Sequence, residues 1–242
     1  MAKEVVEVAD LVRTQREDLV TRITMDDGRV NVFSPDMLAA LHGAFDRAEA
    51  DGTAVLLTGR PECFSAGFDL EVLRGGTFDD VRALLLLGAT LAERILTFPA
   101  PVVVACSGHA FPAGAFLLLA ADHRIGARGQ FKLGLNEVRI GLTPPWFATV
   151  LARYRLGPAY ADHAAVTGTM FDPDGALVAG LLDAVVPRED LEAAALAAAT
   201  DLAALDRQAH AATKLRMRRE VARDLRGAIE SELTPARSAA TA

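Results

Sequence analysis

The chain has 242 residues, of which 51% are hydrophobic and 24% are charged. These values are typical of soluble globular proteins, and they exclude intrinsic disorder and a disulfide-stapled miniprotein. The formal net charge of -7 argues against nucleic acid or an anionic membrane as a partner. The two cysteines, Cys63 and Cys106, have neither metal-binding nor disulfide spacing, so we expect a reducing, cytoplasmic location and no metal site.

Alternating apolar positions predict an N-terminal β-hairpin, with strands around residues 6–13 and 19–25 and a polar loop at 15–18. Ser34 then marks a helix start, because serine is a favourable N-cap and the following proline suits the first helical turn. The wholly apolar run 54–59 predicts a strand that is covered on both faces. The order of elements in this part is therefore strand, helix, strand.

Residues 95–121 contain no Asp, Glu, Lys or Arg, and this stretch is long enough to span a bilayer. Prolines and glycines interrupt it, so we interpret it as soluble core, with a buried strand at 101–106 and a buried helix at 114–121. An amphipathic helix over 78–96 precedes the strand, and a further strand at 123–127 follows the buried helix. Repeated β-then-α units of this kind predict an α/β fold with a mostly parallel sheet.

The character of the chain changes after residue 146, where alanine-rich helical stretches follow one another with only a short strand-like piece at 184–187. We expect a core over residues 1–187 that holds the functional site. Residues 188–242 then form a C-terminal helical segment that packs on a neighbouring subunit.

Three separated patches carry residue types that a plain core does not require. Residues 63–70 place a Ser-Ala-Gly turn before a helix start, where unpaired backbone N–H groups can bind an oxyanion. Residues 107–115 lead through small side chains into another helix N-terminus, which offers a second N–H donor. Within 133–138, Glu137 is a lone carboxylate among apolar residues, and burial of such a group raises its pKa toward the range of a general base.

The order and spacing of these patches resemble the enoyl-CoA hydratase/isomerase, or crotonase, superfamily over nearly the whole chain. The resemblance implies a crotonase (ClpP-like) spiral of ββα units with a C-terminal helical trimerisation segment. It also implies a homotrimer or a hexamer made of two trimers, an acyl-CoA thioester as substrate, and no separate cofactor, because coenzyme A is part of the substrate. In this family two backbone N–H groups hold the thioester oxygen of an enolate. Carried over to this sequence, they belong to Ala66 and Ala113.

The carboxylates of the site separate the subfamilies. Hydratases of the family usually carry two glutamates; here Phe116 occupies the first position and Glu137 the second. This pattern resembles the Δ3,Δ2-enoyl-CoA isomerases of lipid metabolism, in which one glutamate removes a proton from C2 and returns it to C4. We therefore expect isomerisation of 3-enoyl-CoA to 2-enoyl-CoA. The alternatives are hydration of 2-enoyl-CoA to 3-hydroxyacyl-CoA, and a non-catalytic acyl-CoA-binding protein.

Other interpretations remain open for several of these residues. Taken alone, a carboxylate such as Glu137 is more often exposed or ion-paired, here with Arg139 as the candidate partner, and its place in the family pattern is what favours a base. For Asp69 we expect a structural helix cap in place of a catalytic role. Neither His109 nor His123 has a spacing partner, so both are expected to be packed or hydrogen-bonded.

Candidate substrate contacts come from aromatic and basic side chains. Phe68, Phe116 and Trp146 are candidates for an acyl pocket, with ordinary core packing as the alternative. The resemblance suggests that Lys214 meets the phosphates of coenzyme A from the C-terminal helices, with a solvated helix face as the alternative.

Overall fold

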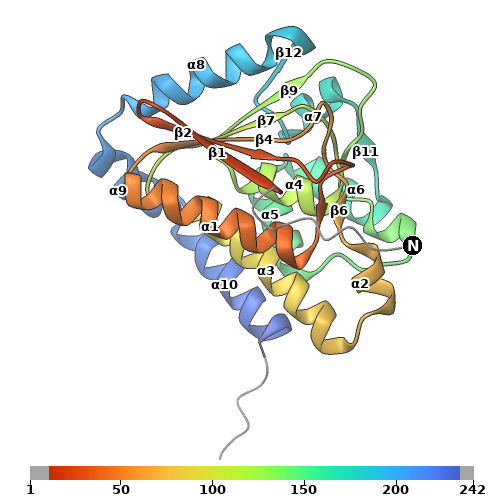
Figure 1. Ribbon diagram of the computed structural model, residues 1–242. Coiled ribbons are helices and arrows are strands. Elements are labelled where there is room, and N and C mark those ends of the chain that lie inside the picture. The colour runs from red at the N-terminus through yellow and green to blue at the C-terminus, as the bar shows by residue number, and fades with distance from the viewer. Residues whose placement is uncertain (1–10, 235–242) are drawn as a thin grey trace, which may run out of the picture.

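The computed structural model describes residues 11–234, and a twisted six-stranded sheet lies at its centre (Figure 1). The strand order is β1-β2-β4-β7-β9-β12; β1 and β2 are antiparallel and every other neighbouring pair is parallel. The strands are β1 (Val12–Glu17), β2 (Val20–Met25), β4 (Ala54–Thr58), β7 (Val102–Cys106), β9 (His123–Ala127) and β12 (Ala184–Val186).

Smaller sheets lie beyond the carboxyl ends of the central strands. One has the order β11-β10-β8-β5, and the other is the parallel pair β3-β6. Their strands are β3 (Val32–Phe33), β5 (Glu62–Ser65), β6 (Gly67–Phe68), β8 (Gly108–Ala110), β10 (Leu133–Gly134) and β11 (Met170–Phe171). Each of β5 and β8 continues the chain directly after a strand of the main sheet, which gives the repeated ββα order.

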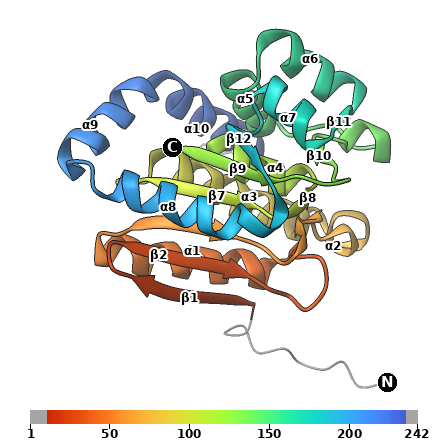
Figure 2. The ribbon, with the colours of Figure 1, turned by 90° about the horizontal axis from the view of Figure 1, so that it is seen from above.

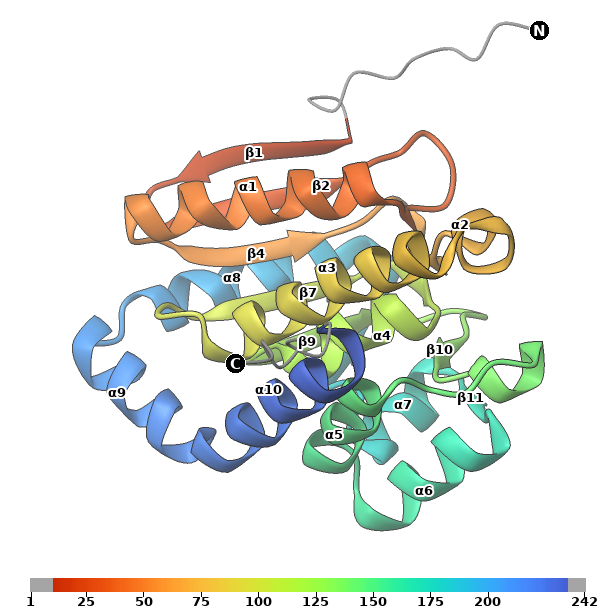
Figure 3. The ribbon, with the colours of Figure 1, turned by 90° about the horizontal axis from the view of Figure 1, so that it is seen from below.

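Helices cover both faces of the main sheet: α1 and α3 pack on one face and α8 on the other (Figures 2 and 3). The helix α10 lies against α3 and α5. The helices are α1 (Pro35–Asp51), α2 (Leu70–Gly75), α3 (Phe78–Thr97), α4 (Pro112–Ala120), α5 (Trp146–Arg155), α6 (Pro158–Thr167), α7 (Pro173–Ala179), α8 (Leu191–Ala203), α9 (Arg207–Met217) and α10 (Arg219–Leu233). Two 3-10 turns, η2 (Glu137–Ile140) and η3 (Arg188–Asp190), complete the described chain.

Most of the predicted elements are present, with two differences in detail: the hairpin, and β11, a second strand in the stretch after residue 146 where only the piece at 184–187 was expected. Residues 15–17, predicted as loop, belong to β1, because the chain reverses more tightly, at Asp18 with φ 51°. The predicted strand residues 6–10 lie outside the described part of the chain. The helix after Ser34 begins as expected, since the Ser34 side chain accepts a hydrogen bond from Met37 N.

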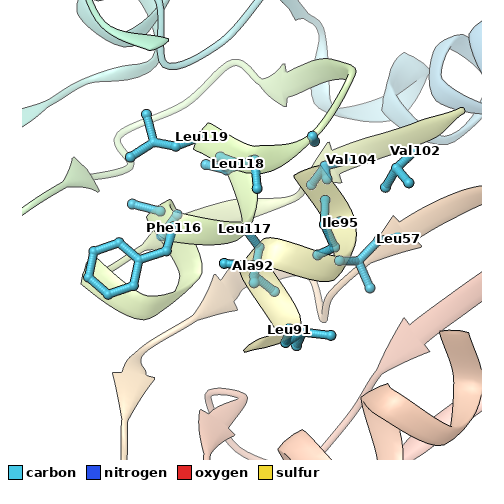
Figure 4. Close-up of a cluster of buried hydrophobic side chains, with 14 of the residues drawn as sticks. Leu57, Leu91, Ala92, Ile95, Val102, Val104, Phe116, Leu117, Leu118 and Leu119 are labelled. Atoms are coloured by element: carbon cyan, nitrogen blue, oxygen red, sulfur yellow. The ribbon is translucent and has the colours of Figure 1, made fainter. Parts of the chain in front are cut away.

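The core lies where α3 and α4 meet strand β7. Figure 4 shows α4 side chains Leu117 and Leu118 close to Ile95 of α3 and Val104 of β7, while the Phe116 ring points to the opposite side of α4. All of these side chains are almost completely buried. The charge-free stretch thus forms the end of α3, the strands β7 and β8 and the short helix α4. Between residues 11 and 234 no helix is both long and apolar enough to cross a membrane.

Candidate active site

A cavity of about 410 Å³ lies beside the N-terminus of α4. This volume falls in the range of small-molecule sites, roughly 300–1,000 Å³. The β5–β6 turn, α2, α3, α4, η2 and the end of α10 supply its wall. Most of the lining is apolar, including Leu70, Leu73, Val81, Leu85, Ile140 and Leu142.

Glu137 lines this cavity and is only 5% exposed. Neither of its carboxylate oxygens has a hydrogen-bond partner within the described residues. Burial raises the pKa of Glu137 to about 7. Arg139 does not pair with it, since the Arg139 Nε atom donates to Gly168 O at 2.6 Å. A carboxyl group in such surroundings exchanges its proton near neutral pH, as a general base requires.

The Ser-Ala-Gly turn leads to a different candidate N–H group from the one expected. The Ala66 N–H donates to Val30 O at 2.9 Å, so it is not available to an oxyanion, and its assignment as a donor is wrong. The strand pair β3–β6 identifies the alternative. Asp69 N donates to Phe33 O, and bonding alternates along a parallel strand, so the Phe68 N–H points away from β3.

The second expected donor, Ala113, is the second residue of α4. N–H groups in a first helical turn have no acceptor within the helix, and the N-cap Phe111 provides no side-chain acceptor. The helix dipole adds positive potential at this end. Ala113 itself is buried, while its neighbours Pro112 and Phe116 line the cavity.

The two turns are held against each other by Ser65. Its carbonyl oxygen accepts a hydrogen bond from Phe111 N at 3.0 Å. Its Cβ atom lies so close to Gly114 that a Cβ built on that glycine would be 2.9 Å away. A Cβ built on Gly67 would lie 3.7 Å from Ala113 N. The segments that carry the Phe68 and Ala113 N–H groups are therefore in direct contact.

Aromatic rings form the wall next to these donors. Phe116 lies with its ring centroid 6.2 Å from that of Phe68 and 5.3 Å from that of Phe147. The Phe68 ring fits against α3 only because residue 88 is glycine, where a Cβ would come within 2.4 Å of the ring. Both Phe68 and Phe116 line the cavity, in agreement with their choice as candidate acyl contacts.

Trp146 and Lys214 do not belong to this cavity. The Trp146 side chain is 67% exposed, because it is the first residue of α5 and points to solvent, and the preceding Pro145 lines the cavity in its place. Lys214 is buried, and its Nζ atom donates to Asp122 Oδ2 at 2.7 Å and to Ala100 O at 3.3 Å. It is committed to this ion pair, so the expected contact with coenzyme A phosphates is not possible in this conformation.

The remaining sequence candidates have structural roles. Asp69 caps α2 by accepting hydrogen bonds from Glu71 N and Val72 N. His109 accepts one from Lys132 N, and His123 lies 3.5 Å from a carboxylate oxygen of Asp183.

Two features of the site were missed by the sequence interpretation. One is the Phe68 N–H, which only the strand register identifies. The other is Glu232, on the last turn of α10, which lines the same cavity as Glu137. No local motif marks a carboxylate that reaches a site from a distant helix.

A second cavity, of about 510 Å³, adjoins the first at Ala66, Phe68 and Leu70, which line both. Arg29 lines this outer cavity and is exposed. It makes no ion pair with any described residue, and the lining also includes the carboxylates Asp27, Asp69 and Glu71. Asp27 and Asp69 accept hydrogen bonds from backbone N–H groups, which leaves Arg29 as a basic group available to an anion.

Comparisons with known proteins agree with this arrangement. A family model described as enoyl-CoA hydratase/isomerase matches residues 15–240. An enoyl-CoA hydratase/isomerase family protein from Pseudomonas syringae has 43% identity and a TM-score of 0.91, over 94% of this chain and 99% of its own. The Mycobacterium ulcerans enoyl-CoA hydratase EchA3 has 40% identity and a TM-score of 0.89, over 91% and 97%.

The third similar structure is an enoyl-CoA isomerase of Mycobacterium tuberculosis, with 39% identity and a TM-score of 0.88 over 92% of this chain and 97% of its own. The expected crotonase spiral is therefore confirmed. Because the relatives are enzymes, the interpretation as a non-catalytic binding protein is set aside. The chain belongs to the enoyl-CoA hydratase/isomerase family of the crotonase superfamily.

Proposed function

We propose that this enzyme isomerises 3-enoyl-CoA to 2-enoyl-CoA, with Glu137 carrying the proton. The observation that supports this most directly is the isolation of Glu137. It is a buried carboxylate that has no hydrogen-bond partner among residues 11–234, on the wall of a mostly apolar cavity. Such a group removes a C2 proton as the carboxylate and returns it to C4 as the acid, so no second acid is needed.

The backbone N–H groups of Phe68 and Ala113 would stabilise the dienolate that forms between these two proton transfers. Negative charge develops on the thioester oxygen, and two preorganised donors at the contact of two turns are suited to hold it. Removing one donor of this kind typically costs about 10²- to 10³-fold in rate.

Acyl-CoA as substrate is supported by the two adjoining cavities. The inner one is apolar and suits an acyl chain, and the outer one carries Arg29, which suits a phosphate of coenzyme A. The thioester would then lie at their junction, next to the Phe68 N–H.

Hydration of 2-enoyl-CoA is the second candidate, because a second carboxylate, Glu232, also lines the inner cavity. Isomerisation is better supported. The wall at the position of the hydratases' first glutamate is the buried ring of Phe116, and one Glu232 oxygen already accepts a hydrogen bond from Trp146 N at 2.8 Å.

The test is product analysis by mass and chromatography after incubation of the enzyme and its Glu137→Gln variant with 3-enoyl-CoA and with 2-enoyl-CoA. A shift of the double bond without change of mass, lost in the variant, is the expected result. A gain of one water by the 2-enoyl substrate would instead identify a hydratase. Near-full isomerase activity in Glu137→Gln would overturn the role of this glutamate.

A further inference from the structure

Glu232 reaches the acyl cavity from the C-terminal helix α10, which packs against α5 and α3 (Figure 3). Its Oε2 atom accepts a hydrogen bond from Trp146 N at 2.8 Å. Trp146 opens α5, whose N-cap Pro145 has no side-chain acceptor, so Glu232 supplies the missing cap from another helix. The contact fixes one oxygen of the carboxylate beside Pro145, which itself lines the cavity.

Within the described part of the chain, the ionisable side chains that line the cavity carry negative charge only. Its ionisable lining residues, among residues 11–234, are Glu137 and Glu232, both acidic. No lysine, arginine or histidine of the described chain lines it. A carboxylate introduced by a ligand would find no cation to pair with, and it would meet the negative charge of Glu232 in a cavity with mostly apolar walls. A neutral chain would meet no such repulsion.

We propose that Glu232 determines specificity by excluding acyl chains that end in a carboxylate, so that the site takes neutral acyl groups. This inference rests on the proposed function only in taking acyl-CoA as the ligand. It assigns Glu232 no part in proton transfer. The hydrogen bond from Trp146 N to Glu232 Oε2 holds the carboxylate in place. The negative charge of Glu232 disfavours acyl chains that end in a carboxylate.

The variant Glu232→Gln separates the charge from the structural role. A glutamine side-chain oxygen can still accept the hydrogen bond from Trp146 N, so the α5 cap is retained while the negative charge is lost. Glu230→Gln is the matched control, because it makes the same chemical change on the same helix at an exposed position outside the cavity lining.

The measurement is calorimetric binding of hexanoyl-CoA and of adipoyl-CoA, two saturated thioesters of equal chain length, of which only adipoyl-CoA ends in a carboxylate. Wild type and Glu230→Gln should both prefer hexanoyl-CoA. In Glu232→Gln the affinity for adipoyl-CoA should rise about fivefold to tenfold, the effect of one unit charge about 4 Å away, because Glu232 is exposed to solvent as well as lining the cavity. The affinity for hexanoyl-CoA should stay within about twofold.

The proposal is overturned if wild type binds both thioesters equally, or if the preference is the same in Glu232→Gln as in wild type. A change of equal size in Glu230→Gln also overturns it, because the effect would then be one of overall charge. Saturated thioesters bind without turnover, so the preference can be present even if no isomerase activity is found. In that case the proposed function fails and this inference stands, whereas failure of both thioesters to bind removes both.

Discussion

Ser65 Oγ donates a hydrogen bond to the carbonyl oxygen of Asn31 at 2.7 Å, and both residues are completely buried. Asn31 has the left-handed φ of 53°, and its side-chain amide donates to Met25 O and to Phe64 O. Ser65 Oγ also accepts a hydrogen bond from Gly67 N at 3.1 Å. This chain of contacts fixes the turn that presents the Phe68 N–H.

We therefore expect Ser65→Ala to lower kcat about tenfold or more while KM changes little, because small displacements of oriented groups are costly in the transition state. Loss of a buried hydrogen bond should also lower the free energy of unfolding by about 1–3 kcal/mol. Steady-state kinetics and thermal unfolding check both effects. The kinetics are measured at a temperature where the variant is folded. If the unfolding temperature falls but kcat is unchanged, Ser65 has a structural role only.

Phe116, in the aromatic wall of the cavity, predicts a variant that gains hydration activity. Phe116→Glu should increase hydration of 2-enoyl-CoA at least about tenfold over wild type, because a positioned acid or base contributes typically about 10²- to 10⁴-fold. Phe116→Gln is the control, because glutamine has a size and polarity similar to those of glutamate but cannot ionise. Water addition is followed by mass. If the glutamine variant hydrates as well as the glutamate variant, access of water and not acid–base chemistry accounts for the gain.

Local pattern identified two helix starts after small residues and a lone carboxylate among apolar residues, and the family resemblance then singled out Ala113 and Glu137 among them. The choice between Ala66 and Phe68 depends on which N–H pairs with β3, and that register is a long-range property. Lys214 was misjudged for a similar reason, since Asp122, its partner, lies far away in the sequence.

The outer cavity predicts that Arg29 contacts a phosphate of coenzyme A, the role expected from the sequence for Lys214. Arg29→Gln should raise KM for an acyl-CoA about fivefold to tenfold, as expected for one charge-assisted hydrogen bond to an exposed phosphate. It should leave kinetics with an acyl-pantetheine, which lacks the nucleotide, unchanged. Arg47→Gln, at an exposed position on α1, is the matched control. An equal loss with both substrates would rule out a phosphate contact.

Lys214 is expected to matter for stability. Asp122 accepts hydrogen bonds from Lys214 and from Val102 N, and it also pairs with Arg218 at 2.7 Å. Loss of one partner of a buried ion pair typically costs about 3–5 kcal/mol. Because Asp122 keeps Arg218, we expect Lys214→Met to cost about 3 kcal/mol in denaturant unfolding. A raised KM for acyl-CoA with unchanged stability would contradict the structural role.

Glu137 links activity, stability and pH. Burial raises the pKa of its carboxyl group to about 7 in the folded enzyme, against an ordinary value of 4.5. The folded state thus binds this proton more tightly than the unfolded state. The group therefore causes no loss of stability below the ordinary pKa, and its destabilising effect grows as pH rises and is complete above about 7.

Replacing Glu137 by glutamine removes that effect. At pH 8 Glu137→Gln should unfold with a free energy higher by on the order of 3 kcal/mol, while at pH 4 the two proteins should differ little. In wild type, kcat/KM should rise with pH through about 7, as the carboxylate forms. Denaturant unfolding at the two pH values and a pH–rate profile measure these effects separately. A variant that is equally stabilised at both pH values would show that relief of packing, and not of buried charge, is responsible. Stabilisation confined to pH 8, with loss of activity, is the result expected of a base whose burial costs stability and provides function.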